Sequence, residues 1–302
     1  MSIAVSLVTA MSAAQANTIN FTTLRSGFVD SFESLSVDPS NGKVYERTSF
    51  QGGTAVRVYA NMVDFAAATP SSTLNLAPQG FYGTYSAVRD GQLYGRSSNG
   101  SNSDAMTWST TTGTQTSSIS GYAGMGGING TDTFNWGGYS GVNFMQDSTG
   151  LYVVGGAAGA GNNNWQIETL GTGLNSVSST VFSPAGSGSL GYGFIINGTL
   201  FTGASFSSNN VTNAINVDTG AVSIVNNNLL GLGSSYYLSD FSYNYASDTL
   251  YAYNTMTRTF YQAANASVQF GVPAAVIPEP GTLILLGLGL AGLGFSRRKR
   301  AS

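Results

Sequence analysis

The clearest pattern in this chain is an alternation of apolar and polar residues that stops at a turn and then resumes. Alternation of this kind places one face of a strand on a core, and Asn-Gly or Asp-Gly turns tolerate the positive φ of a tight hairpin. Each copy therefore predicts a β-hairpin whose second strand closes on an aromatic residue. The five copies are Leu35–Tyr45, Ser86–Tyr94, Val142–Tyr152, Tyr192–Phe201 and Phe241–Tyr251.

The spacing of these hairpins is nearly regular. Successive closing aromatics are 49, 58, 49 and 50 residues apart. In three copies a second hairpin follows, and it turns at a glycine 19, 21 and 19 residues after the aromatic. Its first strands are Ala105–Trp108, Trp165–Ile167 and Ala214–Val217. Four strands in about 50 residues are typical of a propeller blade.

The repeat predicts an all-β fold, a β-propeller-like ring of about five four-stranded blades over residues 30–272. The first copy lacks the glycine turn, although Val56–Tyr59 fits a third strand, and the fifth has a shorter final strand after Asn254–Thr257. The segment Ile19–Thr23 is expected to pair with the last blade, which would close the ring and remove exposed sheet edges. The Gly-rich stretch Ser120–Gly138 reads as a loop that accounts for the longest spacing. A β-sandwich and a β-solenoid are the alternatives.

Composition excludes several kinds of chemistry. The 302 residues contain no Cys and no His, which rules out disulfides, Cys–His and Ser–His–Asp catalysis and the commonest metal ligand. We expect no cofactor and no metal. The segment from Asn17 to Ala275 contains 13 acidic and 7 basic residues. Its net charge of −6 argues against nucleic acid as a partner.

The carboxylates offer no clear catalytic pair. Five aspartates occupy hairpin positions, where Asp makes Asx turns: Asp38, Asp90, Asp147, Asp218 and Asp248. Others show no spacing that suggests cooperation: Asp30, Glu33, Asp64, Asp104, Asp132, Glu168 and Asp240. A calcium loop around Asp38–Gly42 has too few carboxylates to be convincing.

Aromatic residues flanked by Gly, Ser and Asn are better candidates for a binding site, because flat rings can stack on the apolar faces of sugars. Trp108 and Trp165 fit third-strand core positions, however, and Tyr82, Tyr85, Tyr122 and Tyr139 can equally pack between blades. Only Trp136, inside the Gly-rich loop, is predicted to be free for glycan stacking.

Both ends of the chain carry targeting signals. Residues 1–16 are similar to a secretory signal peptide, with an apolar run at Ile3–Met11 and a small-x-small cleavage site at Ala14 and Ala16. No Lys or Arg precedes the apolar run, which departs from the usual pattern; an ordinary N-terminal helix is the alternative.

The last segment, residues 276–302, has three parts in order. Pro278, Glu279 and Pro280 form an extended tripeptide, because proline disfavours helix before it. An uncharged run of 16 residues, Gly281–Ser296, follows. As a helix it would reach ~24 Å, short of a ~30 Å hydrocarbon core unless the bilayer thins or arginines snorkel. A buried core helix is the alternative. The predicted anchor residues are Leu283, Ile284, Leu285, Leu286, Leu288, Leu290, Leu293 and Phe295, and the predicted cytoplasmic stop is Arg297, Arg298, Lys299 and Arg300.

This segment resembles the PEP-CTERM sorting signal of proteins that Gram-negative bacteria export. The resemblance implies recognition of Pro278–Pro280 by an exosortase, a membrane-bound transpeptidase, and a role tied to exopolysaccharide or biofilm matrix. It covers about 27 residues and says nothing about the activity of the others.

The sequence thus predicts a signal peptide (1–16), an exported domain (17–275) and a sorting and anchor segment (276–302). We expect a non-enzymatic surface or extracellular-matrix protein with a structural or adhesive role, whose partners are exosortase, the membrane and exopolysaccharide. The alternatives are a carbohydrate-binding propeller and, less favoured, a propeller hydrolase.

Overall fold

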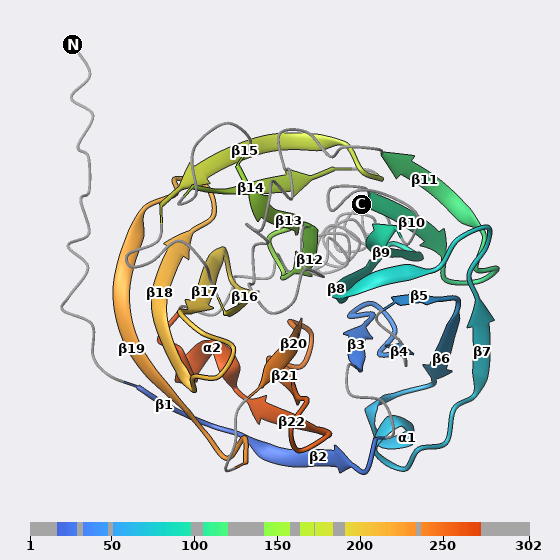
Figure 1. The fold of residues 1–302 in the computed structure, drawn as a ribbon, viewed down its shortest axis with the longest axis horizontal. Coiled ribbons are helices and arrows are strands. Elements are labelled where there is room, and N and C mark those ends of the chain that lie inside the picture. Colours follow the sequence, from blue (N-terminus) through green and yellow to red (C-terminus); the bar gives the residue numbers. More distant parts are fainter. Residues whose placement is uncertain are drawn as a thin grey trace, which may run out of the picture.

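The fold is a ring of five β-sheets around a central axis, a five-bladed β-propeller (Figure 1). The computed structural model describes residues 17–28, 33–47, 51–97, 105–119, 142–157, 164–171, 173–183, 191–233 and 237–272. Each sheet runs from an innermost strand at the axis to an outermost strand at the rim, and neighbouring blades pack face to face.

The first three blades are continuous in sequence, with one addition. Blade one is β3 (Ser34–Val37), β4 (Val44–Arg47), β6 (Ala55–Tyr59) and β7 (Ser72–Asn75). Blade two is β8 (Phe81–Arg89), β9 (Gln92–Ser97), β10 (Ala105–Ser109) and β11 (Gln115–Ile119), and the short β5 (Gln51–Gly53) pairs with β8. Blade three is β12 (Val142–Gln146), β13 (Leu151–Gly156), β14 (Trp165–Leu170) and β15 (Ser176–Phe182).

The last two blades incorporate the N-terminal strands. Blade four is β16 (Tyr192–Ile196), β17 (Thr199–Gly203), β18 (Asn210–Asn216) and β19 (Val222–Leu230). The parallel strand β1 (Thr18–Asn20) extends it at the rim. Blade five is β20 (Leu238–Asn244), β21 (Thr249–Asn254) and β22 (Thr259–Ala264), and its fourth strand is β2 (Thr22–Ser26), antiparallel to β22.

The five predicted hairpins are confirmed, each as the first two strands of a blade. The three predicted second hairpins are the third and fourth strands of blades two, three and four. In blade one a short helix, α1 (Met62–Ala66), replaces the missing glycine turn, and Asn61 caps it by accepting the Asp64 N–H at 2.9 Å.

Ring closure is more extensive than the sequence predicts. The predicted pairing of Ile19–Thr23 with the last blade is confirmed through Thr22 and Thr23 of β2. Ile19, however, belongs to β1 and pairs with Leu229 of blade four. The N-terminal segment therefore joins two blades, and Figure 1 shows it running along the lower rim from β19 to α1.

The core lies in the layers between blades. All five closing aromatics are 2–4% exposed. Trp108 and Trp165 are 0% and 1% exposed, which confirms them as core residues of third strands. The closing aromatics lie on second strands and the two tryptophans on third strands, so large rings fill the space between radiating sheets.

Helix is scarce in the described ranges. Besides α1 there is α2 (Ala266–Gln269), which follows the last strand. Within these ranges, neither helix has the length or the apolar character needed to cross a bilayer. The predicted signal helix and the predicted anchor at Leu283–Phe295 lie outside the described residues.

Candidate functional site

Side chains from different blades meet near the axis of the propeller. The Tyr85 hydroxyl of blade two accepts the Gly193 N–H of blade four at 3.4 Å, and Gln146 of blade three donates through Nε2 to the Val37 carbonyl of blade one at 3.0 Å. The cavity beside Gln146 has a volume of only about 10 Å³. A space of that size holds at most one water molecule, so this cavity offers no room for a substrate.

A buried ionic group lies where blades one, two and five meet. Arg47 is 3% exposed and donates to the carbonyls of Gly83 and Thr84 and to the Ser34 hydroxyl. Its guanidinium also stacks 4.1 Å above the Phe81 ring. Burial lowers the pKa of Arg47 to about 10, although the carboxylates of Asp240 and Glu33 oppose this shift.

Asp240 links the last blade to the first from the other side of this group. Its Oδ2 accepts the Leu35 N–H at 2.8 Å, and its side chain is 2% exposed. Burial raises the pKa of Asp240 to about 7, while the Leu35 N–H and Arg47 act in the opposite direction. No spacing along the chain connects Glu33 with Asp240, yet both carboxylates act on Arg47.

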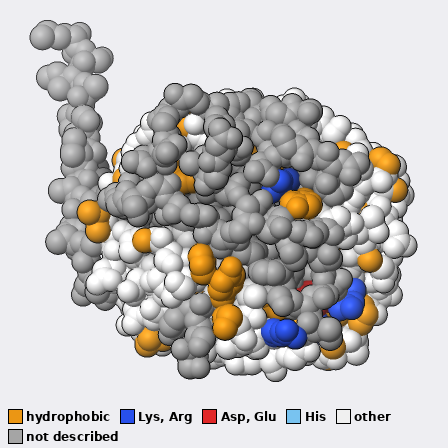
Figure 2. Space-filling view, in the orientation of Figure 1, with side chains coloured by type: hydrophobic (Ala, Val, Ile, Leu, Met, Phe, Trp, Pro, Cys, Tyr) orange, Lys and Arg blue, Asp and Glu red, His pale blue; other side chains and the backbone are white. Residues whose placement is uncertain are grey.

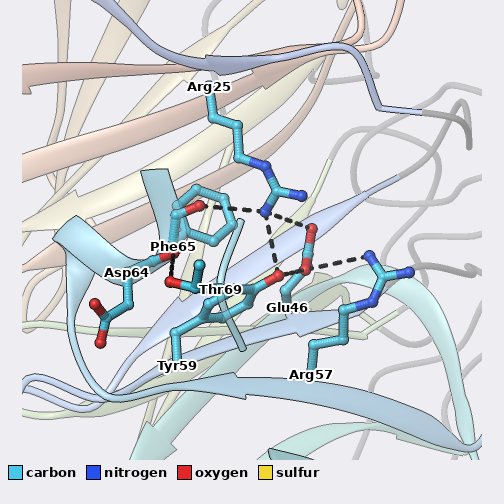
Figure 3. Close-up of polar contacts among 7 residues, drawn as sticks. All are labelled: Arg25, Glu46, Arg57, Tyr59, Asp64, Phe65 and Thr69. Carbon is cyan, nitrogen blue, oxygen red and sulfur yellow. Dashed lines mark hydrogen bonds and ion pairs between the residues drawn. The ribbon is translucent and has the colours of Figure 1, made fainter. Parts of the chain in front are cut away.

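A second ionic cluster, which we call the closure cluster, joins β2 to blade one. Figure 3 shows Arg25 of β2 reaching across the junction toward Glu46 of β4. Its Nη1 lies 3.3 Å from Glu46 Oε1 and donates to the Tyr59 hydroxyl at 3.2 Å and the Phe65 carbonyl at 3.3 Å. Glu46 also accepts from Tyr59 and pairs with Arg57 at 3.5 Å. Its side chain is fully buried, so this carboxylate depends on its partners.

The turn aspartates divide into different structural roles. Asp38 makes the predicted Asx turn, accepting the Ser40 N–H at 2.9 Å, and Asp90 occupies a hairpin position with φ of 51°. In the blade-four turn the acceptor is Asn216 rather than Asp218, whose own N–H is bound by Asn216 at 3.1 Å. Asp248 does not make a local Asx turn; it accepts from Ser267 at the start of α2 and from Tyr243.

Asp147 does more than its predicted turn. It is 0% exposed and accepts the Thr149 and Gly150 N–H groups of its own turn at 2.8 and 3.1 Å. Its second oxygen accepts the Gly198 N–H of the next blade at 2.6 Å. The carboxylate therefore ties the turn of blade three to that of blade four.

Two open grooves lie at neighbouring blade junctions. Groove 1–2, between blades one and two, has a volume of about 530 Å³ and is lined by Asp38, Lys43, Tyr45, Ser72, Gly91 and Thr110, among others. Groove 2–3, between blades two and three, also has a volume of about 530 Å³ and is lined by Arg89, Asp90, Tyr94, Thr116, Ser117 and Gly150, among others. Volumes of this size are in the range of small-molecule sites.

The two grooves are equivalent by the propeller's pseudo-symmetry. Each has the closing tyrosine of its first blade at its base, Tyr45 or Tyr94. Burial raises the pKa of both tyrosines; the charge of Asp38 raises it further for Tyr45, and that of Asp90 for Tyr94. Both phenols therefore stay protonated at neutral pH and can donate or accept a hydrogen bond.

Charge is sparse on the described surface. On the face that Figure 2 shows, apolar side chains stand in scattered patches, and basic side chains lie at the lower right and above the centre. Among the described residues no group of three His, Cys, Asp or Glu side chains is placed to hold a metal ion. The predicted glycan-stacking residue Trp136, the cleavage residues Ala14 and Ala16 and the sorting residues Pro278–Pro280 lie outside the described residues.

This architecture defines the protein as a five-bladed propeller with polar grooves between blades, and the family comparison refines that class. Residues 32–267 match the olfactomedin-like domain family, so the chain belongs to it. Residues 276–299 match the PEP-CTERM protein-sorting motif, which confirms the predicted resemblance and implies export and processing by exosortase. No curated protein matches the chain.

Solved structures agree with the fold. A glutaminyl cyclase from Myxococcus xanthus is similar with a TM-score of 0.50 and 13% identity, over 82% of this chain and 97% of that one. A calcium-binding protein, regucalcin, from Agrobacterium tumefaciens is similar with a TM-score of 0.45 and 14% identity, over 82% and 95%. At such low identity the first likeness shows the fold alone.

Proposed function

We propose that this protein is exported, processed by an exosortase at its C-terminal segment, and then serves a structural or adhesive role in a surface or exopolysaccharide matrix. The observation that carries the proposal is the sorting motif at residues 276–299. A propeller supports such a role because it is rigid and exposes many loops and inter-blade surfaces for binding.

The sorting mechanism follows from the order of the three parts of the segment. A membrane enzyme can reach an extended Pro278–Pro280 only while the apolar run at Leu283–Phe295 keeps the chain at the bilayer. The basic stop Arg297–Arg300 holds that run in place, because each Lys or Arg costs ~2.5–3.5 kcal/mol to insert. Processing would release the domain from this anchor.

The proposal makes no use of catalysis by the propeller. The sequence lacks His and Cys, and the two carboxylates that act on Arg47 are each 2% exposed, so a polymeric substrate would not reach them. Hydrolysis of a polysaccharide that is lost on replacement of a single Asp or Glu would instead favour the hydrolase alternative.

The test is mass spectrometry of the product from cells with and without exosortase. In cells that carry it, we expect the product to begin at Asn17 and to lack the residues after about Pro280. Glu279→Ala should leave the protein membrane-bound and uncut, whereas the neighbouring Thr282→Ala should be processed normally. Deleting Arg297–Ser302 should let unprocessed protein escape. An extracellular form that retains Arg297–Ser302 would defeat the proposal.

A further inference from the structure

We propose that groove 1–2 and groove 2–3 together form one extended binding site for a neutral, polyhydroxylated chain, that is, an uncharged polysaccharide. This inference rests on the proposed matrix role and gives it a site and a ligand class. It uses the geometry of the two grooves, their charge and their hydroxyl groups.

The grooves are adjacent on one face of the ring. A single hairpin turn separates them: Asp90 lines groove 2–3, and Gly91, the next residue, lines groove 1–2. Gly91 also anchors the outer turn of blade two, since its carbonyl accepts the Thr110 N–H at 2.9 Å. A ligand that follows the ring can therefore occupy both grooves by crossing one fixed turn.

The lining favours an uncharged ligand. Lys43 and Asp38 line groove 1–2, and Arg89 and Asp90 line groove 2–3, so each groove contains one basic and one acidic side chain. Neither groove offers the excess positive charge that a polyanion requires.

Hydroxyl groups supply most of the remaining polar surface. In groove 2–3, Thr107 and Thr116 form a hydroxyl pair with oxygens 2.8 Å apart, and Thr116 also bonds Gln92. Groove 1–2 is lined by Ser72 and Thr73 of the outer strand, both exposed. A hydroxyl group can both donate and accept a hydrogen bond, so it can bind the hydroxyl groups of a sugar, whereas an apolar ligand forms no such bonds with it.

The next junction is crossed by several direct hydrogen bonds. Between blades three and four, Asp147 binds Gly198 at 2.6 Å and the Ser148 hydroxyl binds Asn197 at 3.4 Å. Further out on the same junction, the Thr180 hydroxyl donates to the Asp218 carbonyl at 3.2 Å. Direct bonds thus join the turns there. At groove 2–3 the Arg89 guanidinium also bonds the Asp147 carbonyl across the junction at 3.2 Å, yet the groove beside this bond keeps a volume of about 530 Å³.

The test measures binding of the full-length protein to neutral hexose oligomers of increasing length, with a polyuronate as anionic comparator. Ser72→Trp blocks groove 1–2 and Ser117→Trp blocks groove 2–3. Ser178→Trp, on the exposed outer strand β15, is the matched control, and circular dichroism verifies that all variants fold. Two linked weak sites should give long oligomers an affinity about 100-fold above that of short ones.

Each blocking variant should reduce the affinity for long oligomers to that for short ones, and the double variant should abolish binding, while Ser178→Trp has no effect. Binding that is independent of length, or that survives the double block, would overturn the inference. Binding to the polyuronate alone would refute the neutral-ligand argument. Blocked variants that are still processed and retained in the matrix would sink this inference while leaving the proposed function intact.

Discussion

The closure cluster should determine whether the ring stays shut, and Arg25→Met tests this directly. Methionine keeps an apolar stem of similar length but lacks the guanidinium, whose carbon lies 4.4 and 5.0 Å from the ring centres of Phe28 and Phe65. The substitution therefore removes the charge, the three hydrogen bonds and the stacking of the guanidinium on the rings, while keeping most of the side-chain length.

The expected loss is about 3 kcal/mol, the lower end of the range for removing one partner of a buried ion pair. The lower end applies because Glu46, which is fully buried, keeps its bonds to Tyr59 and Arg57. For a chain of this size such a loss lowers the melting temperature by roughly 6–12 °C. Arg57→Met is the matched control: its side chain is 46% exposed, so its loss should cost ~0–1 kcal/mol.

Equilibrium urea unfolding supplies the free energies from midpoint and slope. Adding Glu46→Gln to Arg25→Met should recover part of the stability, because the uncompensated buried charge is then gone. The reasoning fails if Arg25→Met costs no more than Arg57→Met, which would mean that the closing strand is held by its backbone pairing alone.

Three further substitutions test other parts of the ring. Asp240 has a folded-state pKa of about 7, above the unfolded value near 3.9, so the folded state binds more protons between these two pH values. The free energy of unfolding should therefore fall from pH 4 to pH 7, by at most ~4 kcal/mol from this group. Asp240→Asn should remove that part of the pH dependence, and identical urea midpoints for both proteins at every pH would contradict this. Asp147→Ala removes a buried acceptor that binds N–H donors of two blades and should cost about 3 kcal/mol. Replacing the exposed Asp218 by Ala should change stability by no more than ~0.5 kcal/mol. Equal urea midpoints for the two variants would refute the linking role. Gly95→Ala would place a Cβ 1.6 Å from an atom of the Phe81 ring and should cost ~1–3 kcal/mol, so an unchanged melting temperature would show that the ring moves freely.

The blades could be predicted because their signals are local. A turn such as Asp90-Gly91 needs positive φ at both residues, which the structure shows as 51° and 72°, and the alternation on either side fixes the strands. The pairing of Ile19 with Leu229 could not be predicted, since β1 is three residues long and its partner lies 210 residues away.

The buried ionic groups could not be predicted from residue spacing either, because their members are far apart along the chain. Asp240 and Leu35 are 205 residues apart, and only the closed ring brings them together. One signal was present: a carboxylate in the middle of an apolar inner strand, Leu238–Tyr243, must find a partner when the strand is buried. The grooves had no such signal, because their hydroxyl residues look like ordinary solvent-exposed strand positions.

The two ends of the chain have separate consequences for maturation. The N-terminal strands complete blades four and five, and Asn17, the first residue after the predicted cleavage site, already accepts the Asn228 N–H through its carbonyl at 2.9 Å. The ring can therefore close fully only once the last blade has joined the first strands. At the other end, the last blade strand stops at Ala264 and α2 at Gln269, before the sorting motif begins at residue 276. Cleavage near Pro280 would thus remove none of the strands that the structure describes, so we expect the released domain to keep its five blades.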